Sequence, residues 1–149
     1  MLETIKIENW LIEVNVDKTL EFYRKDLNIC SCLGCNNFVE ACKYIKTPVL
    51  DVFRKLGINP AKPAHLSEFP TMEDGVRQYI GSYHFVGRVF EGEMSTLSNS
   101  NETNTFEIEN FAFGFSVDLE FVPEDFPSPV VQLDFDAYID WVLDDNLDE

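Results

Sequence analysis

Two segments in the C-terminal third of the chain alternate strictly between apolar and polar positions. In residues 111–121 and 131–143 the odd-numbered positions are mostly aromatic or aliphatic, and most even-numbered ones are small or acidic. A period of two places alternate side chains on opposite faces of a strand, so the pattern predicts two half-buried strands. We expect burial of Phe111, Phe113, Phe115, Leu133, Phe135, Ile139 and Trp141, and exposure of Asp118, Glu120, Asp134 and Asp136.

Further strand-like segments lie upstream. Residues 5–16 alternate with a change of parity at Glu8 and Asn9, which predicts one strand with a bulge. Residues 78–90 are rich in Tyr, Phe, Val and Ile and predict another strand. Between these segments, residues 59–75 contain three prolines and no regular period, which predicts a long surface loop.

Helical signals are confined to the N-terminal part. Asp17 precedes an apolar pattern of helical spacing, and Asn37 with Glu40 has the spacing of a capping box. A third helix is indicated between Thr47 and Gly57, with Pro48 in its first turn. Short helices followed by mostly antiparallel strands predict an α+β fold, with the helices packed on the sheet. We expect a single domain over residues 1–149, with a helical, cysteine-containing part at about 17–57, the loop at 59–75 and a β-rich acidic part at 76–149.

The acidic residues are concentrated in the C-terminal half of the chain. Residues 1–75 have a net charge of −2 and residues 76–149 a net charge of −14, which together give the −16 of the whole chain. A negative field repels nucleic acids and anionic membranes and attracts basic partners. The sequence has no basic segment followed by an apolar run, and no stretch near the length of about 18 apolar residues that a membrane helix needs. We therefore expect a cytoplasmic protein that binds neither nucleic acid nor membrane.

Three cysteines form the densest group of chemically special residues. Cys30, Cys32 and Cys35 could bind zinc as thiolates, since a C-x-x-C turn holds two sulfurs near one tetrahedral ion. Cys42 is too far along the helical pattern to complete that site, so we expect it to pack as a small hydrophobe. Thiol redox chemistry is a second interpretation, although a helix rather than a strand precedes the motif. A third is that the cysteines only fill a tight turn around Gly34.

The segment 79–88 combines aromatic residues, glycines, His84 and Arg88. It could form the wall of a ligand pocket, or a central strand whose glycines let neighbouring rings pack closely. The sequence contains no nucleophile–base motif, P-loop or dinucleotide-binding motif, and the many carboxylates single out no acid–base pair. The enzyme question therefore stays open, and the residues favour a non-enzymatic protein.

The outward-facing acids of the predicted strands carry the leading functional hypothesis. Their parity predicts one acidic sheet face, formed by Asp118, Glu120, Asp134, Asp136 and Asp140. Such a face either binds a basic partner protein, as toxin-neutralising immunity proteins do by analogy only, or simply keeps the protein solvated. The rival hypothesis is a metal-binding or thiol module centred on the cysteine motif.

Four motifs together resemble a group of small, uncharacterised bacterial proteins. They are C-x-C-x-x-C-x-N-aromatic at residues 30–38, L-G-I-N-P at 56–60, Y-H-F-V-G-R at 83–88 and W-V-L at 141–143. The resemblance extends over most of the chain and implies a bacterial, single-domain, cytoplasmic protein. It implies no activity.

Overall fold

The computed structural model describes residues 2–25, 32–94, 104–116 and 119–143. Three α-helices, one 3₁₀ turn and seven strands lie in these ranges, which confirms the α+β class. In chain order they are β1 (Leu2–Ile7), β2 (Trp10–Asn15), α1 (Val16–Tyr23), α2 (Leu33–Ala41), η1 (Cys42–Tyr44), α3 (Thr47–Leu56), β3 (His65–Pro70), β4 (Val76–Glu91), β5 (Phe106–Ile108), β6 (Phe111–Ser116) and β7 (Val130–Asp140).

The strands form one antiparallel sheet with β4 at its centre. Its order is β1-β2-β4-β7-β6-β5, and β3 also pairs with β4. The strand β4 has 16 residues, so two shorter strands can pair along the same edge of it. β3 pairs with its first half and β2 with its last residues. On the other side β4 pairs with β7 from Val76 to Val86. All of these pairs are antiparallel, as predicted.

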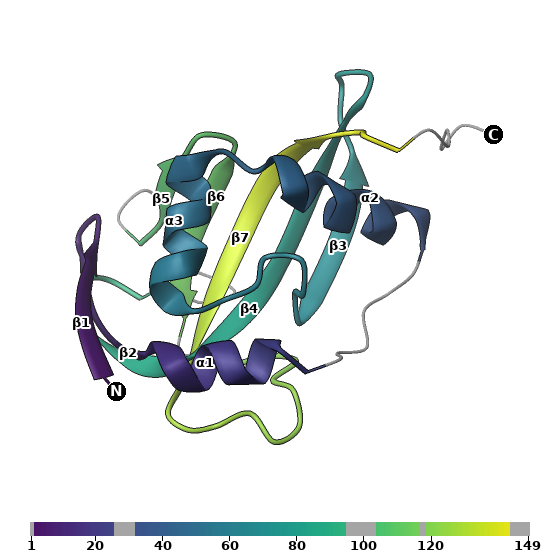
Figure 1. Ribbon diagram of the computed structural model, residues 1–149. Coiled ribbons are helices and arrows are strands. Elements are labelled where there is room, and N and C mark those ends of the chain that lie inside the picture. The colour runs from purple at the N-terminus through teal and green to yellow at the C-terminus, as the bar shows by residue number, and fades with distance from the viewer. Residues whose placement is uncertain (1, 26–31, 95–103, 117–118, 144–149) are drawn as a thin grey trace.

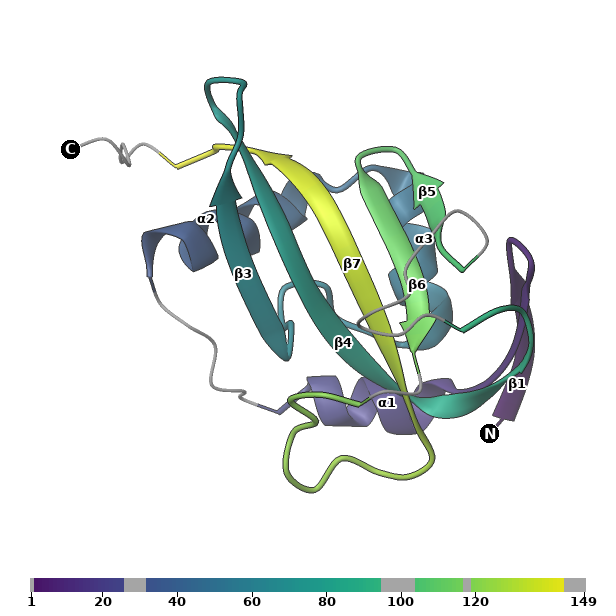
Figure 2. The same cartoon turned by 180° about the vertical axis from the view of Figure 1, so that it is seen from behind.

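The helices cover only one face of the sheet (Figure 1). Seen from behind, β3, β4, β7 and β6 lie bare of helices, and we call this side the open face (Figure 2). The core lies between the sheet and the helices and is mainly aromatic. The ring of Phe53 in α3 contacts Tyr83 of β4 and Phe113 of β6, at centroid distances of 5.0 and 5.6 Å. Burying such a side chain stabilises the fold by about 2–3 kcal/mol.

The alternation in β6 and β7 has the predicted orientation. The apolar residues predicted to be buried are so, at 6% exposure or less, except Trp141. Trp141 is half-buried because β7 ends at Asp140, one residue earlier. The first alternating segment is also shorter than predicted, since β6 ends at Ser116. Phe121, which continued the pattern in the sequence, lies outside the strand and is 61% exposed.

Two predictions about the strands were wrong. The parity change at Glu8 and Asn9 marks a two-residue turn between β1 and β2 rather than a bulge, with Glu8 at a positive φ of 51°. The predicted loop at 59–75 contains a strand, β3, which pairs with β4 from His65 to Pro70. Pro70 is tolerated there because it is the last residue of a strand at the margin of the sheet.

The helix starts also differ from the predictions. Asn15, not Asp17, caps α1, and its side-chain oxygen accepts a hydrogen bond from the backbone N–H of Lys18 at 3.0 Å. The predicted capping box at Asn37 and Glu40 was wrong, because α2 already begins at Leu33 and Asn37 lies inside it. The third helix agrees with its signals: α3 ends at Leu56, and Gly57, which caps this end, has a φ of 80°.

Candidate functional site

The cysteine motif forms the start of α2. The Sγ atom of Cys32 occupies the N-cap position and accepts a hydrogen bond from the backbone N–H of Cys35 at 3.4 Å. Cys32 is exposed and Cys35 is buried, while Cys30 lies outside the described residues. In the described ranges no group of three or more His, Cys, Asp or Glu residues is placed to hold a metal ion. The three-thiolate zinc site therefore stays a prediction.

Asn37 links the same motif to the end of β7. Its amide nitrogen donates hydrogen bonds to the hydroxyl of Tyr79 at 3.3 Å and to the carbonyl oxygen of Asp140 at 3.2 Å. Its amide oxygen accepts the backbone N–H of Val142 at 2.7 Å. Tyr79 in turn donates to the carbonyl oxygen of Gly34 at 2.8 Å, and burial raises the pKa of this tyrosine to about 12. The asparagine of the motif thus has a structural role.

Cys42 packs against the core, as predicted. It is half-buried in η1, and its thiol donates a hydrogen bond to the carbonyl oxygen of Pro60 at 3.5 Å. Burial raises the pKa of this thiol to about 12, so it is neutral at physiological pH. A neutral thiol is a poor nucleophile.

The aromatic strand β4 is a central strand, with its side chains divided between two faces. Tyr79 and Tyr83 point to the helices, and burial raises the pKa of Tyr83 well above its usual value. His84 points to the other face, and Arg88 is exposed near the end of the strand. Gly81 leaves room for the ring of Phe135, as the packing interpretation expected. These residues do not converge on one ligand pocket.

The acidic residues on the open face are less exposed than the parity predicted. Asp134 and Asp136 are half-buried on β7, and Glu120 is half-buried in the segment that follows β6. Asp140 is exposed at the far end of β7, beside a smaller cavity of about 250 Å³. Asp118 lies outside the described residues. The structure thus brings together three of the five predicted acids.

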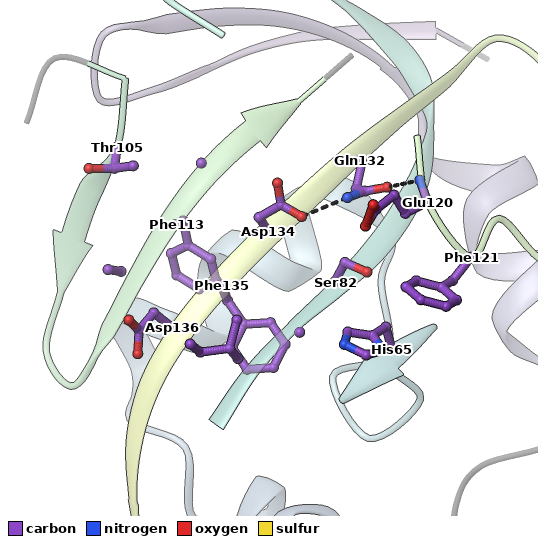
Figure 3. Close-up of a pocket in the computed structure, with 14 residues that line it drawn as sticks. His65, Ser82, Thr105, Phe113, Glu120, Phe121, Gln132, Asp134, Phe135 and Asp136 are labelled. Carbon is purple, nitrogen blue, oxygen red and sulfur yellow. Dashed lines mark hydrogen bonds between the residues drawn. The ribbon is translucent and has the colours of Figure 1, made fainter. Parts of the chain in front are cut away.

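These three acids line a cavity of about 480 Å³ on the open face, which we call the acidic pocket (Figure 3). Its floor is the sheet, where the Cα register aligns four strands in one row. The row consists of His65, Ser82, Asp134 and Gly114, from β3, β4, β7 and β6. Glu120 and Phe121 form a wall, because the chain after β6 returns over this face. The parity argument connected Glu120 with Asp134 and Asp136, but it did not bring His65 or Ser82 to the same place.

Glutamine side chains hold the two aspartates of the acidic pocket in place. Gln132 donates from its amide nitrogen to Oδ1 of Asp134 at 2.7 Å, and its amide oxygen accepts the backbone N–H of Glu120 at 2.6 Å. Gln78 donates to both carboxylate oxygens of Asp136, at 2.9 and 3.2 Å. Such bonds fix the direction of each carboxylate in the pocket.

A buried histidine supports this arrangement from outside the pocket. Nε2 of His84 lies 3.1 Å from the amide oxygen of Gln132. Because that oxygen can only accept, the histidine is the donor and carries its proton on Nε2. Its Nδ1 is buried without a hydrogen-bond partner among the described residues, and burial lowers the pKa of the ring. His84 is therefore neutral at physiological pH and has a structural role.

An aromatic stack borders the acidic pocket. The rings of His65 and Phe121 are nearly parallel, with an interplanar angle of 8° and a centroid distance of 4.5 Å. Phe121 has a positive φ of 56°, which is uncommon for a bulky residue and typical of strained functional or turn positions. This pair was not predictable from local patterns, because His65 lies in a predicted loop and Phe121 continues a predicted strand.

The chain matches no protein-family model, no curated protein and no solved structure. Among the described residues, no helix has both the length and the apolar composition that crossing a membrane requires.

Proposed function

We propose that this protein is a non-enzymatic interaction protein that binds a basic partner protein through the open face. The observation that supports this most is the acidic pocket, where Glu120, Asp134 and Asp136 meet on the one side of the sheet that the helices leave uncovered. Glu120 and Asp136 form no ion pair with any described residue of the chain itself. Their charge is thus available to a cationic surface.

The distribution of charge favours a protein partner of opposite sign. Of the 11 Lys and Arg residues, only Arg77 and Arg88 follow residue 75, and Arg77 is paired with Glu68 on the helix side at 3.2 Å. The open face therefore has a negative field that attracts a basic protein and accelerates its association. The same field repels nucleic-acid phosphates, so we expect no DNA or RNA binding at physiological salt.

Large apolar side chains on the same face favour an interface over a merely solvated surface. Phe69, Ile80 and Tyr138 lie on neighbouring strands and are 42%, 40% and 53% exposed. Protein interfaces are enriched in aromatic residues at their centre and surrounded by a polar rim. The open face combines these exposed apolar side chains with the fixed carboxylates of the acidic pocket, and so it has the composition of an interface. We place the interaction in a bacterial cytoplasm, following the resemblance of the motifs.

The proposal is tested with three forms of the protein immobilised in parallel. One is the wild type, and one is a face variant with Glu120→Gln, Asp134→Asn and Asp136→Asn. The third is a control with the same net charge, in which the exposed acids on the other parts of the molecule are changed by Glu3→Gln, Glu21→Gln and Asp51→Asn. Each is incubated with a bacterial extract treated with nuclease, and the bound proteins are identified by mass spectrometry.

We expect at least one protein with a high isoelectric point to be bound by the wild type and the control and lost from the face variant. Its binding should also decrease as salt is raised, because exposed charges are screened. Equal results for the three forms, including no protein above background, would contradict the proposal. Far-UV circular dichroism of each form verifies that the substitutions leave the fold intact.

A further inference from the structure

We infer that the acidic pocket accepts the side chain of one arginine of the basic partner. This inference rests on the proposed function and names the group that the pocket recognises. Its occupant must be cationic, because Glu120, Asp134 and Asp136 line the cavity. A volume of about 480 Å³ is also in the range of small-ligand sites and exceeds what a single side chain fills, which leaves space for water around the ligand.

The spacing of the acids favours an extended cation over a point charge. Asp134 and Asp136 are two residues apart on one strand, which corresponds to about 6.7 Å along β7. Among the described residues, no three His, Cys, Asp or Glu side chains are placed to hold one metal ion. The three acids of the pocket are therefore too spread out to share a single small cation. A guanidinium has donors along more than one edge and bridges separated carboxylates, whereas an ammonium is a compact point charge.

A buried hydroxyl in the pocket provides a further acceptor. Ser82 is only 4% exposed, and the close-up shows its side chain between Asp134, Glu120 and His65 (Figure 3). Its Oγ has no hydrogen-bond partner among the described residues, although it lines the cavity. Ser82 lines the cavity, so a donor on a ligand can reach this hydroxyl.

The stack of His65 and Phe121 provides the flat surface that arginine prefers. Phe121 is 61% exposed although its backbone is held at a positive φ of 56°. A guanidinium stacks on aromatic faces and keeps its in-plane donors free for carboxylates, which an ammonium cannot do. The pocket therefore combines fixed acceptors on its floor with an aromatic wall.

Titration with two small probes, followed by ¹H–¹⁵N NMR, tests the inference. The probes are N-acetyl-arginine amide and N-acetyl-lysine amide, at equal ionic strength. We expect arginine to shift the amide signals of Ser82, Gln132 and Asp134, and to bind about fivefold more tightly than lysine. Asp136→Asn should weaken arginine binding about fivefold and Ser82→Ala about threefold, since each removes one acceptor. Asp140→Asn, at the exposed end of the same strand, should change it less than about twofold.

Equal affinities for the two probes, or arginine shifts spread over the acidic surface and unaffected by Asp136→Asn, would overturn the inference. The dispersion of the same spectra shows whether each variant is folded, and Ser82→Ala adds a substitution that removes no charge. The result for the arginine probe is independent of the test of the proposed function. If a basic protein is lost from the face variant while the arginine probe does not bind, the interface stands and the arginine pocket does not.

Discussion

The ring of His84 donates a hydrogen bond from Nε2 to the amide oxygen of Gln132 across 3.1 Å, next to the acidic pocket. Through that glutamine it is connected to Asp134, which accepts from the other end of the amide at 2.7 Å. A neutral, buried histidine thus fixes the orientation of a carboxylate that lines the pocket. Protonation of His84 would place a positive charge in the interior and leave the new N–H at Nδ1 without a hydrogen-bond partner among the described residues.

The histidine predicts a decrease of stability in mild acid. In the unfolded chain His84 has its ordinary pKa of about 6.5, and burial lowers the pKa in the folded protein. Between those two values the unfolded chain binds more protons, so the free energy of unfolding decreases as the pH falls below about 6.5 and levels off below the folded pKa. Urea unfolding from pH 7.5 to 5 should show a flatter pH dependence for His84→Gln, which retains an N–H donor and does not titrate. Equal slopes, or an NMR titration of His84 with a pKa at or above 6.5, would contradict this role.

The asparagine of the cysteine motif predicts a large stability effect. Asn37→Asp removes both hydrogen bonds to Tyr79 and Asp140 and buries a charge, so the free energy of unfolding should fall by about 2–4 kcal/mol. Asn36→Asp is the matched control, since its side chain is exposed one residue earlier in the same helix. It should change stability by less than about 0.5 kcal/mol. Similar urea midpoints for the two variants would show that Asn37 does not hold α2 to β7.

A side chain at Gly87 would clash where β2 pairs with β4. A methyl group there would contact the carbonyl oxygen of Glu13 and approach within 3.0 Å of the Cα of Val14, both of which are backbone atoms. Gly87→Ala should therefore destabilise the fold by about 3 kcal/mol. Gly75→Ala meets open space and only the strain of a positive φ, at a cost of about 1 kcal/mol. Thermal unfolding measures the stability of both variants. An equal loss of stability would mean that β2 and β4 accommodate the extra methyl group, which would contradict the prediction.

Cys32 distinguishes the structural turn from the metal site. If its Sγ only caps α2, Cys32→Ser should preserve or slightly raise stability, because serine is a better N-cap, while Cys32→Ala should lower it by about 1 kcal/mol. If Cys30, Cys32 and Cys35 bind zinc, both variants should lose the metal and similar stability. Urea unfolding with elemental analysis of protein purified without chelator decides between them. We expect no zinc or iron above background and a difference between the two variants.

The sequence was most informative where one period governs a long segment. The buried faces of β6 and β7 follow directly from alternation, since a strand with one apolar face has only one way to bury it. The strand β3 was missed because its apolar and polar residues do not alternate and it ends in a proline, and its structure depends on pairing with β4. Local signals cannot show such tertiary stabilisation.

The site was only partly predictable for the same reason. Parity identified Asp134 and Asp136 on a common face, but it could not show that Glu120 and Phe121, in the segment after β6, lie beside Asp134 on that face. The stack of His65 and Phe121 joins two segments that carry no strong pattern. Asn37 was misread because asparagine is common at helix starts, whereas here its partners lie at the far end of the chain.

The association kinetics of the wild type with the basic partner, measured against ionic strength, test the central claim most directly. Asp140 is exposed at the end of the open face, so Asp140→Asn should lower the association rate and leave the dissociation rate nearly unchanged. Asp136 is half-buried in the pocket, so Asp136→Asn should also increase the dissociation rate. The association rate of the wild type should decrease as salt rises through 0.1 M, where the Debye length is about 10 Å. Rates that are independent of salt and equal for the wild type and both variants would contradict the account and reduce the acidic face to a solvated surface.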